Sequence, residues 1–168
     1  MARRERGPRG RAGAATPALE VLTAAGTAHT LHPYEHTEGE THFGQEAVAA
    51  LGVPAERVLK TVVADCGGEL VVTVVPVARQ VDLKALAAAL GAKKAAMAAP
   101  AAAERSSGYV VGGISPLGQR TRLRTVVDAS ALDHTTVLVS AGRRGLQVEL
   151  DPADLVALTG AEVAAVGR

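Results

Sequence analysis

The stretch from Arg105 to Arg120 has a composition suited to binding a polar or anionic group through the backbone. Within it lie four glycines and a Ser-Pro pair: Gly108, Gly112, Gly113, Ser115, Pro116 and Gly118. Glycine permits a positive φ and a close approach of the backbone to a ligand, whereas proline fixes φ. A loop with both properties can present bare N–H groups. The residues alone fit an ordinary tight turn equally well, and the Lys-Ser or Lys-Thr ending of a nucleotide-binding P-loop is absent.

Lys60 is the second residue that could do chemistry, because it interrupts the apolar segment Leu59-Lys60-Thr61-Val62-Val63. A lysine inside a β-branched strand points either to water or into a cleft. On the pattern alone, the solvent-facing position is favoured.

Histidine and cysteine offer less. His29, His32, His36 and His42 lie within fourteen residues of one another, but their spacing matches no standard zinc signature. We therefore predict surface or loop histidines and no metal site. A single cysteine, Cys66, excludes an intramolecular disulfide, and we predict that it is a bystander rather than a nucleophile.

The elements that must position these residues follow from caps, breakers and apolar periodicity. Thr16-Pro17 begins a helix that Gly26 ends, Thr41 is expected to cap a helix over 43–51, and Gly67-Gly68 marks a hairpin turn. Further helices are predicted over 82–90, 100–106 and 152–158. Strands are predicted over 29–34, 59–66, 70–77, 124–128, 135–140, 146–150 and 162–166.

The composition is that of one globular domain: the chain has 168 residues, of which 48% are hydrophobic and 21% charged. A formal net charge of +1 gives no overall basic field, so an RNA partner would need a local cluster. Candidate members of such a cluster are Arg105, Arg120, Arg122, Arg124, Arg143 and Arg144. No apolar run approaches the ~20 residues that span a bilayer, and no secretory signal is evident. We expect a cytoplasmic protein.

Residues 1–15 differ from the rest, because they carry five arginines and almost no apolar bulk. We predict a disordered basic arm there and a folded domain over 16–168. The arm would add non-specific attraction to nucleic-acid phosphates, or have no role.

The motif Gly112-Gly113-Ile114-Ser115-Pro116, preceded by Arg105-Ser106-Ser107-Gly108-Tyr109, closely resembles the YbaK/EbsC family of aminoacyl-tRNA deacylases. These proteins are relatives of the editing domain of bacterial prolyl-tRNA synthetases. The resemblance runs from about Thr16 to Val166. It implies a single α/β (α+β) domain, with a mixed, mostly antiparallel, barrel-like sheet surrounded by helices. It also implies removal of a wrong amino acid from tRNA without a metal or other cofactor.

The resemblance reverses the expectation for Lys60, because the matching Lys-Thr lysine lies in the family's active-site pocket. We expect Lys60 to bind the terminal nucleotide or to stabilise the oxyanion of the ester. Backbone groups from Gly112 to Pro116 would orient the 3′ end, and Tyr34 and Phe43 would line the pocket. The predicted catalytic residues are Lys60, Gly112 and Ser140, and the predicted substrate-binding residues are Tyr34, Phe43, Thr61, Gly113, Ile114, Ser115, Pro116 and Gln147.

One departure concerns Gln147, where some relatives carry an aspartate that belongs to the site. Glutamine hydrogen-bonds but serves neither as a base nor as a counter-ion, which leaves the amino-acid preference open. Glu149 would share a strand face with Gln147, and the pattern does not assign it a role.

The members that the chain resembles most act on cysteinyl-tRNA, chiefly Cys-tRNA(Pro), and there the substrate's own thiol can attack the ester. The chain has no Gly-x-Ser-x-Gly elbow, in keeping with a site that needs no protein nucleophile. Water attack, a preference for alanine or serine, a non-catalytic tRNA-end module and a hydrolase of small aminoacyl esters stay open. The expected partners are the 3′ end of aminoacyl-tRNA and prolyl-tRNA synthetase, with no membrane or DNA partner.

Overall fold

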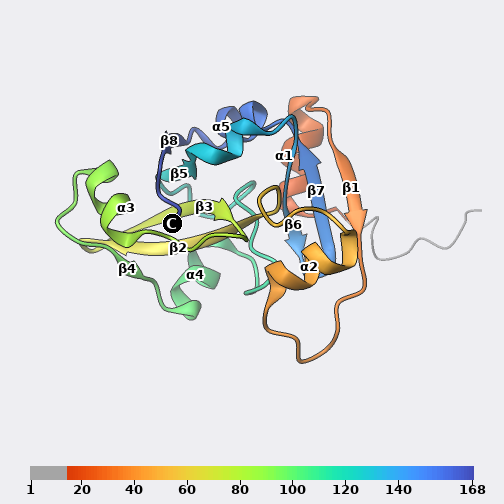
Figure 1. Cartoon of the computed structure of the whole chain (residues 1–168), viewed down its shortest axis with the longest axis horizontal. Helices are drawn as coiled ribbons and strands as arrows, with labels where there is room; N and C mark the ends of the chain where they lie inside the picture. The colour runs from red at the N-terminus through yellow and green to blue at the C-terminus, as the bar shows by residue number, and fades with distance from the viewer. Residues whose placement is uncertain (1–14) are drawn as a thin grey trace, which may run out of the picture.

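The computed structural model describes residues 15–168, so the predicted basic arm lies outside the described residues except at its last position. The described residues form helices α1 (Pro17–Ala25), α2 (Phe43–Leu51), α3 (Leu83–Leu90), α4 (Pro100–Ser107) and α5 (Pro152–Thr159), and the 3-10 helix η2 (Ala129–Asp133). The strands are β1 (Thr30–Pro33), β2 (Leu59–Cys66), β3 (Glu69–Pro76), β4 (Ala96–Met97), β5 (Thr125–Asp128), β6 (Val137–Arg143), β7 (Leu146–Leu150) and β8 (Glu162–Ala164) (Figure 1). None of the helices in this part of the chain combines the length and the apolar character needed to cross a bilayer.

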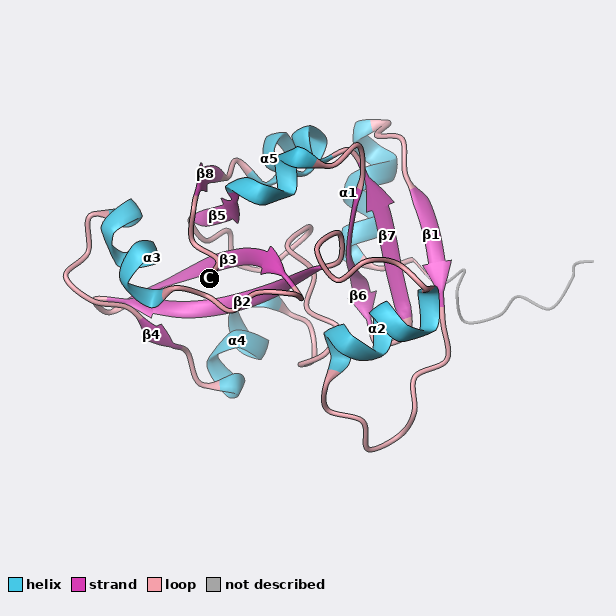
Figure 2. Ribbon diagram, in the orientation of Figure 1, coloured by secondary structure: helices cyan, strands magenta, loops and turns pink. Residues whose placement is uncertain are grey.

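The strands form two separate sheets, which stand side by side in Figure 2 with their strands at a steep angle. One is antiparallel in the order β1-β7-β6, and the other is mixed in the order β4-β2-β3-β5-β8. In the mixed sheet β2 pairs antiparallel with β3 and β4, whereas β5 runs parallel to β3 and β8. The fold is therefore the expected mixture of helices and strands.

The expected barrel is wrong. Within residues 15–168, the sheets are linked by one isolated bridge between Val58 and Leu138. Closure fails because β6 and β7 pair with each other and β7 with β1, so neither extends the mixed sheet. The two sheets meet instead through packed side chains.

The helix ends follow the predicted chemistry at most positions. Thr16, Asp82 and Asp151 each accept a hydrogen bond from the first turn of their helix, and Gly26 ends α1 with a φ of 65°. The predicted cap of α2 is wrong, because His42 rather than Thr41 holds the N-cap position and makes no capping hydrogen bond with its side chain.

Three apolar clusters hold the layers together. The largest joins the two sheets to α1 and α5, with Leu22, Val74, Val139 and Leu155 fully buried. A second packs α3 on the mixed sheet through Leu86, Val71 and Val126, among others. The third packs Ala47 of α2 against Val58, Val77 and Leu138, at the point where the two sheets meet. This last cluster places the start of α2 beside the start of β2.

Candidate active site

A cavity of about 320 Å³ lies where α2, β2, the glycine-rich loop and the β6–β7 pair come together. Its size falls at the lower end of the range for small-ligand sites. Its wall is formed by Thr41, His42, Phe43, Gly44, Gln45, Val58, Leu59, Lys60, Thr61, Val62, Val111, Gly112, Ile114, Ser140 and Gln147. These residues are far apart in the chain, so the cavity is a product of the tertiary fold.

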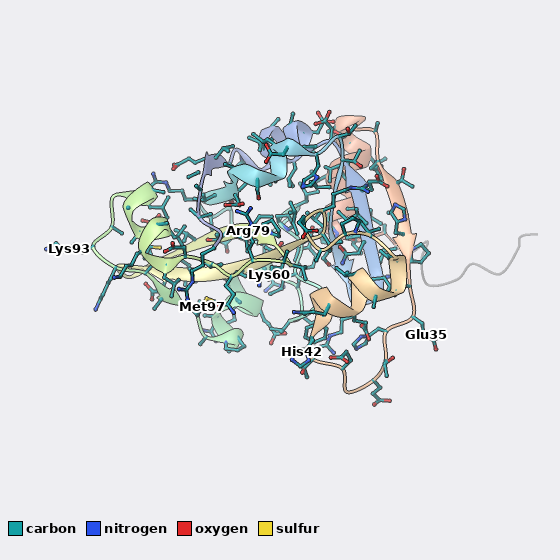
Figure 3. The ribbon with its side chains drawn as sticks, in the orientation of Figure 1. Glu35, His42, Lys60, Arg79, Lys93 and Met97 are labelled. Atoms are coloured by element: carbon teal, nitrogen blue, oxygen red, sulfur yellow. The ribbon has the colours of Figure 1, made fainter. Side chains whose placement is uncertain are left out.

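Lys60 lies near the middle of the molecule, at the end of β2 that faces the β6–β7 pair (Figure 3). It is half-buried in the cavity wall, and burial lowers the pKa of its ammonium group. Among residues 15–168 it has no ion-pair or hydrogen-bonding partner within reach. The solvent-facing position that the pattern favoured is therefore wrong, and the cleft position implied by the resemblance is confirmed. Such a cation is available to an oxygen of a ligand.

The glycine-rich loop divides into a cavity side and a buried side. Gly112 and Ile114 line the cavity together with Lys60. Gly112 has a φ of 90°, and a Cβ there would lie 2.6 Å from the Phe43 ring, so only glycine fits. This close packing brings the bare backbone of the loop to the same space as the ammonium group.

Gly113, Ser115 and Pro116 lie behind the cavity wall rather than on it. All three are buried, and a Cβ on Gly113 would lie 2.7 Å from the Cα of Arg143. Ser115 Oγ accepts a hydrogen bond from the Leu117 N–H. These residues hold the loop against β6, so any contact with a substrate would be made through Gly112 and Ile114.

Phe43 forms one wall of the cavity and is held on two sides. The His36 ring lies 5.7 Å from it, centroid to centroid, and the Arg144 guanidinium carbon lies 4.8 Å from its centroid. Arg144 Nε also donates to the Val111 carbonyl at 2.9 Å. Arg144 thus ties the β6–β7 turn to the glycine-rich loop across Phe43, a role that the sequence did not reveal.

Ser140 and Gln147 face each other across β6 and β7, and both are buried in the cavity wall. Ser140 Oγ accepts from the Gly142 N–H at 3.2 Å. Gln147 Oε1 and Thr61 Oγ1 are buried and have no hydrogen-bonding partner among the described residues. Buried polar atoms are nearly always paired. Thr73 Oγ1 also lacks a partner but lies outside the cavity, whereas Gln147 and Thr61 line it and can therefore meet a ligand.

Tyr34 does not line the cavity, contrary to the prediction, but lies behind Gln147. Its N–H donates to the Gly145 carbonyl at 2.9 Å, which joins β1 to the β6–β7 turn. Burial raises the pKa of the Tyr34 phenol, and a hydrogen bond with the Gln147 side chain offsets part of that rise. Gln147 Oε1 itself has no hydrogen-bonding partner among the described residues.

The four histidines that lie close together in the sequence contact different partners, and His29 Nδ1 lies 2.7 Å from the Thr27 carbonyl oxygen. His32 contacts Glu149 at 2.7 Å, His36 contacts Glu46 at 2.5 Å, and His42 contacts Glu40 at 3.2 Å. No cluster of His, Cys, Asp or Glu able to hold a metal ion occurs within residues 15–168.

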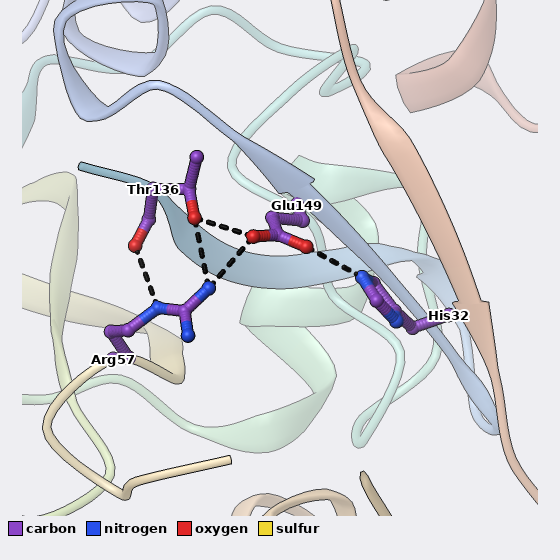
Figure 4. Close-up of polar contacts among 4 residues, drawn as sticks. All are labelled: His32, Arg57, Thr136 and Glu149. Carbon is purple, nitrogen blue, oxygen red and sulfur yellow. Dashed lines mark hydrogen bonds and ion pairs between the residues drawn. The ribbon is translucent and has the colours of Figure 1, made fainter. Parts of the chain in front are cut away.

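A hydrogen-bonded network of four polar side chains lies close to the cavity (Figure 4). Arg57 donates to the Thr136 carbonyl at 2.9 Å, to Thr136 Oγ1 at 2.8 Å and to Glu149 Oε2 at 2.7 Å. Glu149 also accepts from Thr136 and contacts His32, and these contacts hold the pKa of its carboxyl below the ordinary value. The network joins the residues just before β2 to β7, and so fixes Lys60 relative to Gln147.

The predicted arginine cluster is divided between two places. Arg124 pairs with Glu162 at 2.7 Å and lines a second cavity with Lys93 and Lys94. Figure 3 shows Lys93 at the far end of the molecule from Lys60. Arg144 contacts Phe43 in the cavity wall, and the backbone of Arg143 packs against Gly113 behind it.

Sequence reasoning missed the first turn of α2, which supplies His42, Gly44 and Gln45 to the wall. Its N-cap makes no side-chain hydrogen bond, and Phe43, Gly44 and Gln45 of this turn line the cavity. The available signal was the absence of Ser, Asp or Asn just before Phe43.

Comparison with known proteins matches this chain to the family of the aminoacyl-tRNA editing domain over residues 38–158. A protein of Enterococcus faecalis named as the Cys-tRNA(Pro)/Cys-tRNA(Cys) deacylase EbsC is 38% identical over 136 residues, which cover 79% of this chain and 82% of that protein. A crystal structure described as a trans-editing enzyme for prolyl-tRNA synthetase has a TM-score of 0.79 at 23% identity, over 90% of this chain and 95% of the other. The crystal structure of a hypothetical protein, APE2540, has a TM-score of 0.81 at 27% identity, and the match covers 91% of this chain and 100% of the other. The chain belongs to the aminoacyl-tRNA editing domain family.

Proposed function

We propose that this protein is a trans-editing aminoacyl-tRNA deacylase that removes cysteine from mischarged tRNA(Pro). The observation that carries the proposal is the half-buried, unpaired Lys60, which shares one cavity with the bare backbone of Gly112. Similarity to the Enterococcus faecalis protein supports cysteine as the amino acid to be removed.

In this mechanism, Lys60 stabilises the negative charge that develops on the ester carbonyl oxygen. An ester to the tRNA ribose is already activated, so positioning and charge stabilisation suffice without a protein nucleophile. Gly112 and Ile114 orient the 3′ end, and Ser140 supplies a polar contact. The neutral, half-buried environment strengthens the interaction between the ammonium group and the oxyanion.

Two attacking groups are compatible with the cavity. With the substrate thiol, sulfur bonds to the carbonyl carbon, the bond to the ribose oxygen breaks, and that oxygen takes the thiol proton. The product is then a thiolactone. With water, the same bond breaks and free amino acid is released. No Asp or Glu of the described residues lines the cavity to act as a base for water, which favours the thiol route.

The partners follow from the reaction. At about 320 Å³ the cavity is far too small for the body of a tRNA, so only the acylated 3′ end can enter it. A net charge of +1 gives weak overall attraction to RNA, and we propose that prolyl-tRNA synthetase supplies the selection of the tRNA. The activity belongs with translation in the cytoplasm.

The test is a deacylation panel of Cys-, Ser-, Ala- and Pro-tRNA(Pro) with the wild type and Lys60→Ala. We expect Cys-tRNA to be cleaved fastest, and Lys60→Ala to lower kcat/KM by about 10²–10³-fold. Circular dichroism checks that the variant is folded. Wild-type turnover by Lys60→Ala would remove Lys60 from the mechanism, and equal loss of Ser- and Cys-tRNA would favour water attack.

The same panel separates the other candidate functions. A non-catalytic module would bind the tRNA end tightly and cleave no ester. A hydrolase of small aminoacyl esters would cleave a free cysteine ester as fast as Cys-tRNA. The unpaired ammonium group favours catalysis over simple binding, because its burial is costly unless a ligand's charge compensates it.

A further inference from the structure

Among the described residues, the cavity wall contains a cation but no carboxylate. Within residues 15–168 the wall contains the ammonium group of Lys60 but no Asp or Glu. An aminoacyl ester with a free α-amine carries a positive charge of its own when protonated. A wall of this composition repels that charge and offers it no counter-ion.

The nearest carboxylates are all engaged elsewhere. Glu149 lies two residues beyond Gln147 but is paired with Arg57 and His32. Glu46 is held by His36, and Glu104 accepts the N–H of Val111. Glu40 contacts His42 beside the cavity, yet it is exposed and lines a neighbouring hollow instead. None of them faces the space beside Lys60.

What the wall does offer is a neutral acceptor. Gln147 Oε1 is buried without a partner, and its side chain is 93% buried within the structure, since 7% of the residue is exposed. A carbonyl oxygen of this kind pairs with a neutral N–H as well as with a charged one.

We propose that this cavity binds the aminoacyl group with its α-nitrogen uncharged, donating an N–H to Gln147 Oε1. The protein consequently accepts N-acylated aminoacyl-tRNA, whose α-nitrogen is a neutral amide, as a further class of substrate. The inference rests on the proposed deacylase function and specifies its substrate. Gln147 acts in it as a specificity-determining residue.

The experiment compares Cys-tRNA(Pro) with N-acetyl-Cys-tRNA(Pro), each rate divided by the uncatalysed rate for the same ester. For the wild type we expect the two enhancements to agree within about threefold. If the site relied on a charged α-ammonium group, acetylation would lower the rate enhancement roughly ten- to a hundredfold, because one charged hydrogen bond would be lost. A loss of that size would overturn the inference.

A second experiment uses a variant that adds the counter-ion missing from the cavity wall. Gln147→Glu should shift the preference toward the free amine by roughly tenfold or more, because the new carboxylate pairs with an ammonium group. Gln80→Glu makes the same charge change at an exposed position outside the cavity, and should leave the preference unchanged. An unchanged preference in Gln147→Glu would contradict the role of Gln147.

The proposed function and this inference predict different results if they are wrong. If the wild type cleaves neither ester, the proposed deacylase function is wrong. If it cleaves Cys-tRNA and spares the acetylated form, the function stands and this inference is overturned.

Discussion

Two groups of polar residues meet on β7, which carries both Gln147 and Glu149, and they differ in one respect. The network of Arg57, Thr136, Glu149 and His32 satisfies its own charges and hydrogen bonds. Two to three residues away in the chain, the cavity holds Lys60 and Gln147 with polar atoms that have no partner within residues 15–168. Lys60 and the network side chains are partly exposed, whereas Gln147 is buried, so burial alone does not separate the two groups.

This difference distinguishes polar groups that stabilise the fold from polar groups that bind a ligand. A network that satisfies itself gains stability from its contacts and needs nothing from outside. A half-buried group without a partner lowers stability until a ligand supplies one. Substitutions in the two groups should therefore change stability in opposite directions.

Lys60→Met gives the largest expected effect. It removes the charge and keeps the length of the side chain, so kcat/KM for Cys-tRNA should fall by about 10²–10³-fold. Stability should stay level or rise, because burial lowers the pKa of Lys60 and so disfavours its charged form in the folded state. Single-turnover deacylation and urea unfolding measure the two effects. Lys93→Ala, an exposed lysine at the far end, is the control.

Arg57→Met tests the other group. It leaves Glu149 with His32 and Thr136 but without its guanidinium partner, which should cost about 1–3 kcal/mol in the free energy of unfolding. Activity should fall less than about fivefold, a loss of under 1 kcal/mol, because Arg57 only positions the start of β2. If Arg57→Met lost activity but kept its stability, Arg57 would belong to the active site. The network and the cavity would then not be separate groups.

How much of this could be predicted from the sequence depends on the range of the interactions. Helix ends depend on neighbouring residues, and Asp82 with Gly91, or Asp151 with Gly160, predicted α3 and α5 correctly. The barrel depended on which strands meet across the chain. Val137 of β6 pairs with Leu150, and no local pattern says that β6 stays apart from β5. The two-residue strand β4 and the 3-10 helix η2 are too short to give a periodic signal.

The site divides in the same way. Lys60 and Gly112 were predicted through a resemblance carried by contiguous motifs, and the structure brings both to one cavity. Tyr34 was assigned to the wall, but Gln147 lies between it and the cavity, an arrangement set by the pairing of β1 with β7. Arg144 was missed because its contacts with Phe43 and Val111 join segments that are distant in sequence.

The network around Glu149 should also make the stability of the protein depend on pH in the acid range. Within the described residues, the cavity wall has no carboxylate that could do the same. The pKa of Glu149 is lowered in the folded protein, chiefly by the Thr136 hydroxyl and then by His32. Its contribution is therefore present above the unfolded glutamate pKa of about 4.3, and is lost as pH falls through the lower folded value. The stability difference between the wild type and Glu149→Gln should shrink as the pH falls from 6 to below 4. Urea unfolding across that range measures it, and a difference that does not change with pH would contradict the assignment.

Arg144 lies between the two groups and should give the smallest effect. Its guanidinium stacks on Phe43 and donates to the Val111 carbonyl, so it is partnered, yet the surfaces it joins are walls of the cavity. An exposed cation–π contact contributes about 0.5–1 kcal/mol, and Arg144→Ala should therefore raise KM by about three- to fivefold with kcat nearly unchanged. Arg144→Lys keeps the charge but loses the planar Nε–H donor, and should lie between the alanine variant and the wild type. If lysine restored the wild-type KM in full, charge alone would matter, and the tie between the β6–β7 turn and the glycine-rich loop would have no part in substrate binding.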